Sequence, residues 1–122
     1  MQLQFDFDGI SKDQAIKNVQ KARDLLQDFH PNVPLECQIR VSGGKKGYHG
    51  KIIGNGPEEM HPGIEFLIRQ CSGDDKLRIE IDRKRKKNGI SYDILFDSYE
   101  RMDGVVHHAG KWEVINTQTS FS

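Results

Sequence analysis

Hydrophobic and polar residues alternate strictly near the start of the chain. The apolar positions of residues 2–8 are Leu3, Phe5 and Phe7. A period of two is typical of a β-strand with one buried face, so this pattern predicts a strand. The side chains of Asp6 and Asp8 would then project together from the opposite face of that strand.

Further periodic segments follow, separated by turn residues. Ser11 and Gln14 have the form of a capping box that opens a helical pattern, and His30-Pro31 closes it. A second helical pattern covers residues 60–71. Alternation predicts strands over residues 35–42, 47–53 and 77–82, a hairpin-like extension over 92–97 and a short strand over 112–115.

This order of elements predicts an α+β fold. The order β-α-β-β-α-β is the split plan of RRM-like and ferredoxin-like folds, in which two helices cover one face of a four-stranded sheet. A C-terminal strand or hairpin extension is expected to follow. We expect residues 1–115 to form a single domain and residues 116–122 to be a flexible tail.

The charge balance narrows the classes of partner. Eighteen basic and eighteen acidic residues cancel, so no bulk positive field marks a nonspecific nucleic-acid binder. The basic run over residues 83–87 is typical of a solvated loop, and contact with a template backbone is its other interpretation.

Hydropathy and cysteine usage bear on the compartment. No apolar run approaches the ~20 residues of a membrane span, and the N-terminus lacks the apolar segment of a signal peptide. Cys37 and Cys71 occupy apolar positions of expected elements, so we expect buried, reduced thiols. These features favour a cytoplasmic protein without a membrane partner.

Two short segments carry the candidate chemistry. Asp6 and Asp8 supply paired carboxylates, the hard oxygen ligands that divalent cations require. The segment Ser42-Gly43-Gly44-Lys45-Lys46-Gly47-Tyr48-His49 is a glycine-rich turn whose backbone N–H and ammonium groups suit a phosphate. Together the two segments suggest the handling of a metal-bound nucleotide. Each also has a plainer interpretation: the solvated side of an amphipathic strand, and a loose hairpin with lysines for solubility.

The order of these motifs resembles that of the archaeo-eukaryotic primase (primase-polymerase) superfamily. An Asp-x-Asp, a Ser-Gly-Gly-(basic)-Gly-x-His turn and a hydrophobic strand ending in Asp are similar to the catalytic core of small primases and of end-joining ligase polymerase domains. The resemblance, over about residues 3–97, implies a metal-dependent nucleotidyltransferase of replication or repair. Its implied cofactor is Mg²⁺ or Mn²⁺, and its implied partners are a nucleoside triphosphate and a DNA or RNA template.

The same resemblance implies roles for individual residues. Asp6, Asp8 and Asp82 would be the catalytic metal ligands, and Glu80, Asp93 and Asp97 compete with Asp82 for the third place. The implied triphosphate contacts are Ser42, Lys46 and His49.

The chain also departs from the pattern of that superfamily. Active members usually carry a further module before the Asp-x-Asp, which begins here at residue 6, and the arginine-containing stretch expected after the third acid is replaced by residues 91–97. A minimal relative, a subunit completed by a partner chain and a catalytically silent derivative all remain open.

A non-catalytic RRM-like module that binds nucleic acid or a protein is the alternative function. Such modules stack bases on exposed aromatic side chains of the sheet. Phe5 and Phe7 are expected to face the helices instead. The opposite face of the sheet, which no helix covers, is expected to carry acids and a histidine.

Overall fold

The computed structural model describes residues 1–43, 47–56, 59–60, 63–90, 98–100 and 106–115 of the 122-residue chain. Its strands are β1 (Gln2–Asp8), β2 (Leu35–Val41), β3 (Gly47–Gly54), β4 (Ser98–Glu100), β5 (Val106–His108) and β6 (Glu113–Ile115). Its helices are α1 (Lys12–Phe29), α2 (Ile64–Cys71) and α3 (Lys76–Lys87).

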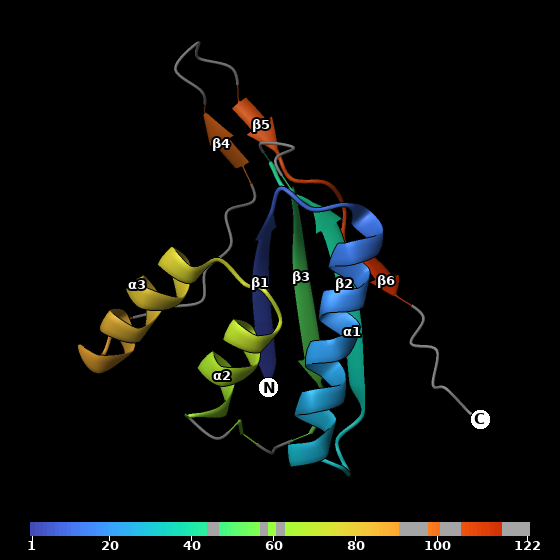
Figure 1. The fold of residues 1–122 in the computed structure, drawn as a ribbon, viewed down its shortest axis with the longest axis vertical. Coiled ribbons are helices and arrows are strands. Elements are labelled where there is room, and N and C mark those ends of the chain that lie inside the picture. Colours follow the sequence, from blue (N-terminus) through green and yellow to red (C-terminus); the bar gives the residue numbers. More distant parts are fainter. Residues whose placement is uncertain (44–46, 57–58, 61–62, 91–97, 101–105, 116–122) are drawn as a thin grey trace.

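One antiparallel sheet organises the molecule, with the strand order β1-β3-β2-β6. Helices α1 and α2 lie on one face of this sheet, and strands β4 and β5 form a separate two-stranded ribbon (Figure 1). The expected α+β class, with two helices on one face, is therefore confirmed. The opposite face of the sheet is called the open face below.

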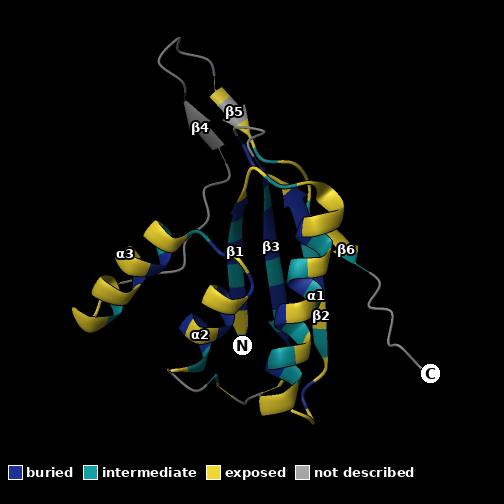
Figure 2. Cartoon of the chain, in the orientation of Figure 1, coloured by how far each residue is buried: buried dark blue, intermediate teal, exposed yellow. Residues whose placement is uncertain are grey.

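The core lies between the sheet and these two helices. The β1 side chains Leu3, Phe5 and Phe7 are buried, and the two phenylalanine rings stack with their centroids 5.6 Å apart. Helix α1 buries the stripe Ala15, Val19, Ala22 and Leu26 against them, while its outer side is exposed (Figure 2). The expected strand over residues 2–8 and its facing are both confirmed.

Local signals define the ends of α1. The Ser11 hydroxyl accepts a hydrogen bond from the Gln14 N–H at 3.2 Å, which satisfies one of the free donors of the first turn. The Gln14 side chain donates to Asn18 at 2.8 Å, so only one half of the capping box forms. The helix ends at Phe29, directly before His30-Pro31, as the sequence predicts.

The expected strand over residues 77–82 is wrong, because this segment belongs to helix α3. The Asp75 carboxylate caps this helix by accepting from the N–H groups of Leu77 and Arg78, at 2.9 and 3.3 Å. The place of the fourth strand is taken by β6, at the far edge of β2. The basic run 83–87 is consequently the C-terminal part of a helix rather than a loop.

Other expectations have mixed outcomes. Cys37 is buried as expected, whereas Cys71 is exposed at the end of α2, and both are free thiols. A short strand is confirmed at β6. The expected extension over residues 92–97 and the tail over 116–122 lie outside the described residues. Within the described part of the chain, no helix is long and apolar enough to cross a membrane.

Candidate metal-binding site

Three carboxylates converge at the end of β1. One oxygen from each of Asp6, Asp8 and Asp75 lies within 4.8 Å of the other two. The first two side chains come from the same side of β1, and the third comes from the connection between α2 and α3. Three carboxylate oxygens this close form an oxygen-only ligand set, which suits Mg²⁺ or Mn²⁺ better than a soft metal.

Backbone hydrogen bonds hold the α2–α3 connection against β1. The Asp75 N–H donates to the Asp6 carbonyl at 3.1 Å, and the Asp6 N–H donates to the Asp74 carboxylate at 2.7 Å. Gly73 precedes this connection with φ +81°, a conformation that side-chain-bearing residues rarely adopt. The reversal at Gly73 thus brings two consecutive aspartates onto a strand that lies 68 residues earlier in the chain.

Asp74 has a different role from its neighbour, because it lies at the centre of a buried ion-pair network. Its carboxylate pairs with Arg69 and, at 2.9 Å, with Arg78. Arg69 is fully buried and also pairs with Asp82 at 2.9 Å. Arg78 reaches β1 as well, by donating to the Gln4 carbonyl at 3.1 Å. The network therefore ties α2, α3 and β1 together behind the three converging carboxylates.

The electrostatics of Asp6 reflect this crowding of acids. Burial raises the pKa of Asp6 to about 6, and the nearby charge of Asp8 adds to the increase. The Arg78 guanidinium opposes this effect, while Asp74 and Asp75 reinforce it. A cation bound among these oxygens would favour the ionised form and so reverse the shift in pKa.

His49 lies beside the carboxylates on the open face. The sheet register places Asp6 opposite His49, and His49 opposite Arg40. Arg40 Nε donates to His49 Nδ1 at 2.9 Å. The accepting Nδ1 leaves the proton on Nε2, which lies 3.8 Å from an Asp6 carboxylate oxygen. His49 thus presents an N–H donor toward the acidic group.

The glycine-rich turn lies at the same end of the sheet. Gly47 pairs with Asp8 across β1 and β3, and the Ser42 N–H donates to the Gly47 carbonyl at 3.1 Å. Ser42 is buried at the start of the turn. A side chain at Gly47 would collide with the Phe7 carbonyl, so the close approach of these strands requires glycine here. Lys46 lies outside the described residues.

The structure places the expected site residues as follows. Asp6, Asp8, Ser42 and His49 lie at one end of the sheet. Asp82 lies on α3, where it is buried against Arg69, and it is not a member of the converging carboxylate group. Glu80, an alternative third ligand, is exposed on the same helix, and Asp93 and Asp97 lie outside the described residues.

Asp75 is the residue that the sequence interpretation missed. Its signal in the sequence is the aspartate pair that follows Ser72-Gly73. An aspartate directly before a run rich in helix-forming residues also indicates an N-cap, and that interpretation would have placed Asp75 at a fixed position.

No family model, curated protein or solved structure matches the chain. The candidate site therefore rests on the geometry of its own residues.

Trp112 gives the open face an aromatic side chain. Its ring lies 4.4 Å from the guanidinium carbon of Arg40 and 4.1 Å from the Lys51 ammonium, and its centroid is 6.5 Å from that of His49. The ring therefore makes cation–π contacts with both basic side chains.

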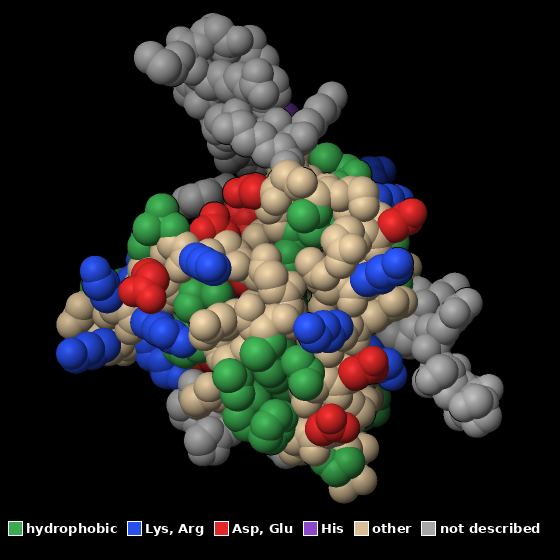
Figure 3. All heavy atoms as spheres, in the orientation of Figure 1, with side chains coloured by type: hydrophobic (Ala, Val, Ile, Leu, Met, Phe, Trp, Pro, Cys, Tyr) green, Lys and Arg blue, Asp and Glu red, His purple; other side chains and the backbone are tan. Residues whose placement is uncertain are grey.

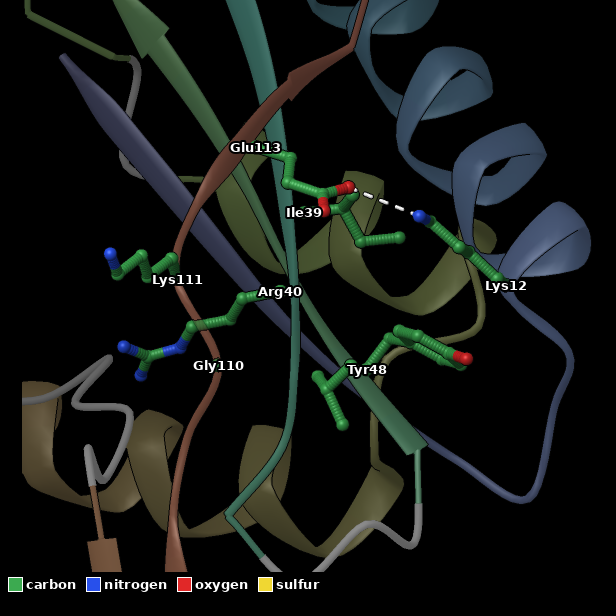
Figure 4. A pocket seen from close by; sticks show the side chains of 8 residues that line it. Lys12, Ile39, Arg40, Tyr48, Gly110, Lys111 and Glu113 are labelled. Atoms are coloured by element: carbon green, nitrogen blue, oxygen red, sulfur yellow. Dashed lines mark hydrogen bonds and ion pairs between the residues drawn. The ribbon is translucent and has the colours of Figure 1, made fainter.

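A small cavity of about 150 Å³ lies nearby, between the edge of β2 and residues 110–113. Arg40 and Tyr48 line it from opposite sides of the sheet, and an ion pair of 3.1 Å between Lys12 and Glu113 closes one side (Figure 4). The three converging carboxylates are not part of its lining.

Proposed function

We propose that this protein is a divalent-metal-dependent nucleotidyltransferase domain of the primase-polymerase type, which binds a nucleoside triphosphate. The observation that carries the proposal is the meeting of Asp6, Asp8 and Asp75 with His49 and with Ser42 and Gly47, which flank the centre of the glycine-rich turn. In the sequence, these features come from three separate segments. Their meeting at one end of one sheet supports a common ligand that has both a metal and a phosphate.

The three carboxylates would hold Mg²⁺ or Mn²⁺. Such ions stabilise the negative charge that develops during phosphoryl transfer and lower the pKa of the attacking hydroxyl. The oxygen-only donor set fits these ions.

The other residues would bind and orient the phosphates. His49 is oriented by Arg40 so that its Nε2–H faces the acidic group, where it can donate to a phosphate oxygen. With a metal bound to lower the pKa of the hydroxyl, His49 would act as a hydrogen-bond donor rather than as a base. Backbone N–H groups of the glycine-rich turn suit the remaining phosphate oxygens.

The burial of the β1 aromatics supports this proposal over the base-stacking alternative. Phe5 and Phe7 are 0% and 1% exposed beneath the helices, so neither offers a surface for bases. A template strand of DNA or RNA, and a partner subunit that completes the site, belong to the proposal as partners.

Calorimetric titration with Mn²⁺, followed by a nucleoside triphosphate, tests the proposal. The site variant is Asp6→Asn/Asp8→Asn, and the matched control is Asp13→Asn/Asp28→Asn, which removes the same charge from the exposed side of α1. We expect the control to bind metal and triphosphate like the wild type and the site variant to bind neither. Equal binding by both variants, with folding verified by circular dichroism, would refute the site.

Incorporation of a labelled nucleotide on a primed template then tests the reaction itself. Incorporation that requires metal and is lost in the site variant supports transfer. Triphosphate binding without incorporation would reduce the proposal to a nucleotide-binding subunit that depends on a partner chain.

A further inference from the structure

Positive charge is concentrated on helix α3. The helix has seven basic and two acidic residues, which gives it a net charge of +5. The whole chain has a formal charge of +0, so the rest of the molecule carries −5. Figure 3 shows Lys and Arg side chains gathered over α3. The balance of the whole composition therefore conceals a strongly polarised molecule.

Four exposed cations share one side of the helix, whereas Arg85 is exposed on the opposite side. At 3.6 residues per turn, Lys76, Arg83, Lys84 and Lys87 fall within an arc of about 100°. We call these four exposed residues the α3 stripe. Glu80 lies within the same arc and is also exposed.

Packing against α2 fixes the direction in which the stripe points. Ile79 and Asp82 are buried on the other side of α3, and Lys86 forms an ion pair with Glu65 of α2 at 2.8 Å. The Arg83 guanidinium carbon lies 5.6 Å from the centroid of the Phe66 ring of α2, at cation–π distance. The helix is thus held with Lys76, Lys84 and Lys87 exposed and with Arg83 at the border with α2.

Helix stability alone does not account for this arrangement. Cations in the last turn interact favourably with the helix dipole, by about 0.3–1 kcal/mol each. Lys76, however, occupies the first turn, where a cation is unfavourable. Arg83 precedes the last turn, so the stripe extends beyond the part of the helix in which the dipole stabilises cations.

The position of the stripe relative to the carboxylates suggests its ligand. Asp75, a member of the acidic group, is the N-cap of α3. At 1.5 Å per residue, Arg83 and Lys87 lie about 12 and 18 Å along the helix axis from that cap. One strand of a duplex carries a phosphate every ~3.4 Å. If such a strand ends at the carboxylates, the phosphates that lie about three to five nucleotides from its end would be next to Arg83 and Lys87.

We propose that the α3 stripe binds the phosphate backbone of a nucleic-acid strand whose end lies at the Asp6, Asp8 and Asp75 carboxylates. The location of the strand end rests on the proposed nucleotidyl transfer, whereas backbone binding by α3 does not. Recognition would be independent of sequence, because contacts to phosphates do not read bases. The acidic group at the other end of the helix repels phosphate and would require a metal ion before a strand end can approach it.

Fluorescence anisotropy with a labelled oligothymidylate of about 15 nucleotides, in EDTA and without triphosphate, tests this binding. The variant is Lys84→Gln/Lys87→Gln, and the control is Lys17→Gln/Lys21→Gln, which removes two exposed lysines from α1. Each lost phosphate contact should weaken binding about fivefold near 0.1 M salt, so we expect about 25-fold for the α3 variant and less than about twofold for the control. The slope of log K against log salt should fall by about 1.4 in the α3 variant only.

A gain of charge provides the opposite test. Glu80→Lys replaces the acid within the stripe and should tighten binding and steepen the salt dependence. Equal weakening by the two double-lysine variants, or an unchanged affinity for Glu80→Lys, would overturn the proposal. So would binding to phosphatidylserine vesicles without binding to the oligonucleotide. The assay contains neither metal nor triphosphate. A negative result would therefore overturn backbone binding by α3 without testing nucleotidyl transfer, which the calorimetric titration tests separately.

Discussion

Replacing Asp74 by alanine should destabilise the protein much more than the same change at its neighbour Asp75. The Asp74 carboxylate accepts hydrogen bonds from the Asp6 and Asp75 N–H groups, at 2.7 and 2.9 Å, and pairs with Arg69 and Arg78. The Asp75 carboxylate makes only the capping bonds to the first turn of α3 among the described hydrogen bonds. Of these two adjacent acids, Asp74 therefore has a structural role and Asp75 is a candidate metal ligand.

The expected magnitudes follow from burial. Arg69 is 0% exposed. After the loss of Asp74, its buried guanidinium retains the ion pair with Asp82 but loses part of the negative charge that compensates it. Removing one partner of a buried ion pair costs about 3–5 kcal/mol. Loss of an N-cap costs about 1 kcal/mol. Since small domains are stable by only about 5–15 kcal/mol, the Asp74 variant should lose a large part of its stability.

Urea denaturation followed by far-ultraviolet circular dichroism measures the difference. We expect the free energy of unfolding of Asp74→Ala to lie about 2–4 kcal/mol below that of Asp75→Ala. Asp75→Ala should instead lose Mn²⁺ binding while it remains folded. If Asp74→Ala does not fold, Asp74→Asn retains one acceptor oxygen and gives a smaller loss. Equal stability of the Asp74 and Asp75 variants would refute the structural role of the network.

Three further predictions concern the site and the core. Without metal, the free energy of unfolding should fall by about 1–3 kcal/mol as the pH rises from about 4 to above 6, because the pKa of the partly buried Asp6 is about 6 in the folded protein against an ordinary 3.8. Urea titrations of wild type and Asp6→Asn across this range measure it, and a variant with the same pH dependence would contradict it. Gly50→Ala should cost about 1–3 kcal/mol, because the new Cβ would lie 2.4 Å from Val19 Cγ2; Val19→Ala in the same chain should recover part of that loss. Ellman's reagent should label only Cys71 in the native protein and also Cys37 in urea, because burial raises the pKa of the Cys37 thiol to about 12.

The sequence predicted the elements whose patterns are local. The alternation over residues 2–8, the stripe of α1 and the hairpin of β2 and β3 each need only a short window and a nearby turn. The same register argument correctly placed Asp6 and His49 on the open face, because a shift by one residue would bury the aspartates and expose the aromatics.

Residues 77–82 show where a local pattern fails. Leu77, Ile79 and Ile81 alternate with charged residues as in a strand, yet in α3 only Ile79 is buried and Leu77 is 68% exposed. Six residues do not distinguish a strand from a helix, and the decisive feature is the Asp75 cap before them. A strand over residues 77–82 would place the Asp82 side chain on the open face. The error in secondary structure therefore also gave the wrong position for the expected third acid.

The acidic site depends on the contact between the α2–α3 connection and β1, which no local sequence pattern encodes. The distribution of charge at this contact is the main reason to propose a cation there. Four aspartates meet where the α2–α3 connection crosses β1, and arginines pair with Asp74, the one that holds the backbone together. The charges on Asp6, Asp8 and Asp75 remain close enough that burial and repulsion raise the pKa of Asp6 despite Arg78. A chain selected for stability alone would gain by replacing one of these three acids with an amide, which removes the repulsion without loss of volume. We therefore propose that a divalent cation compensates the three mutually repelling carboxylates, which lie beside an ion-paired fourth.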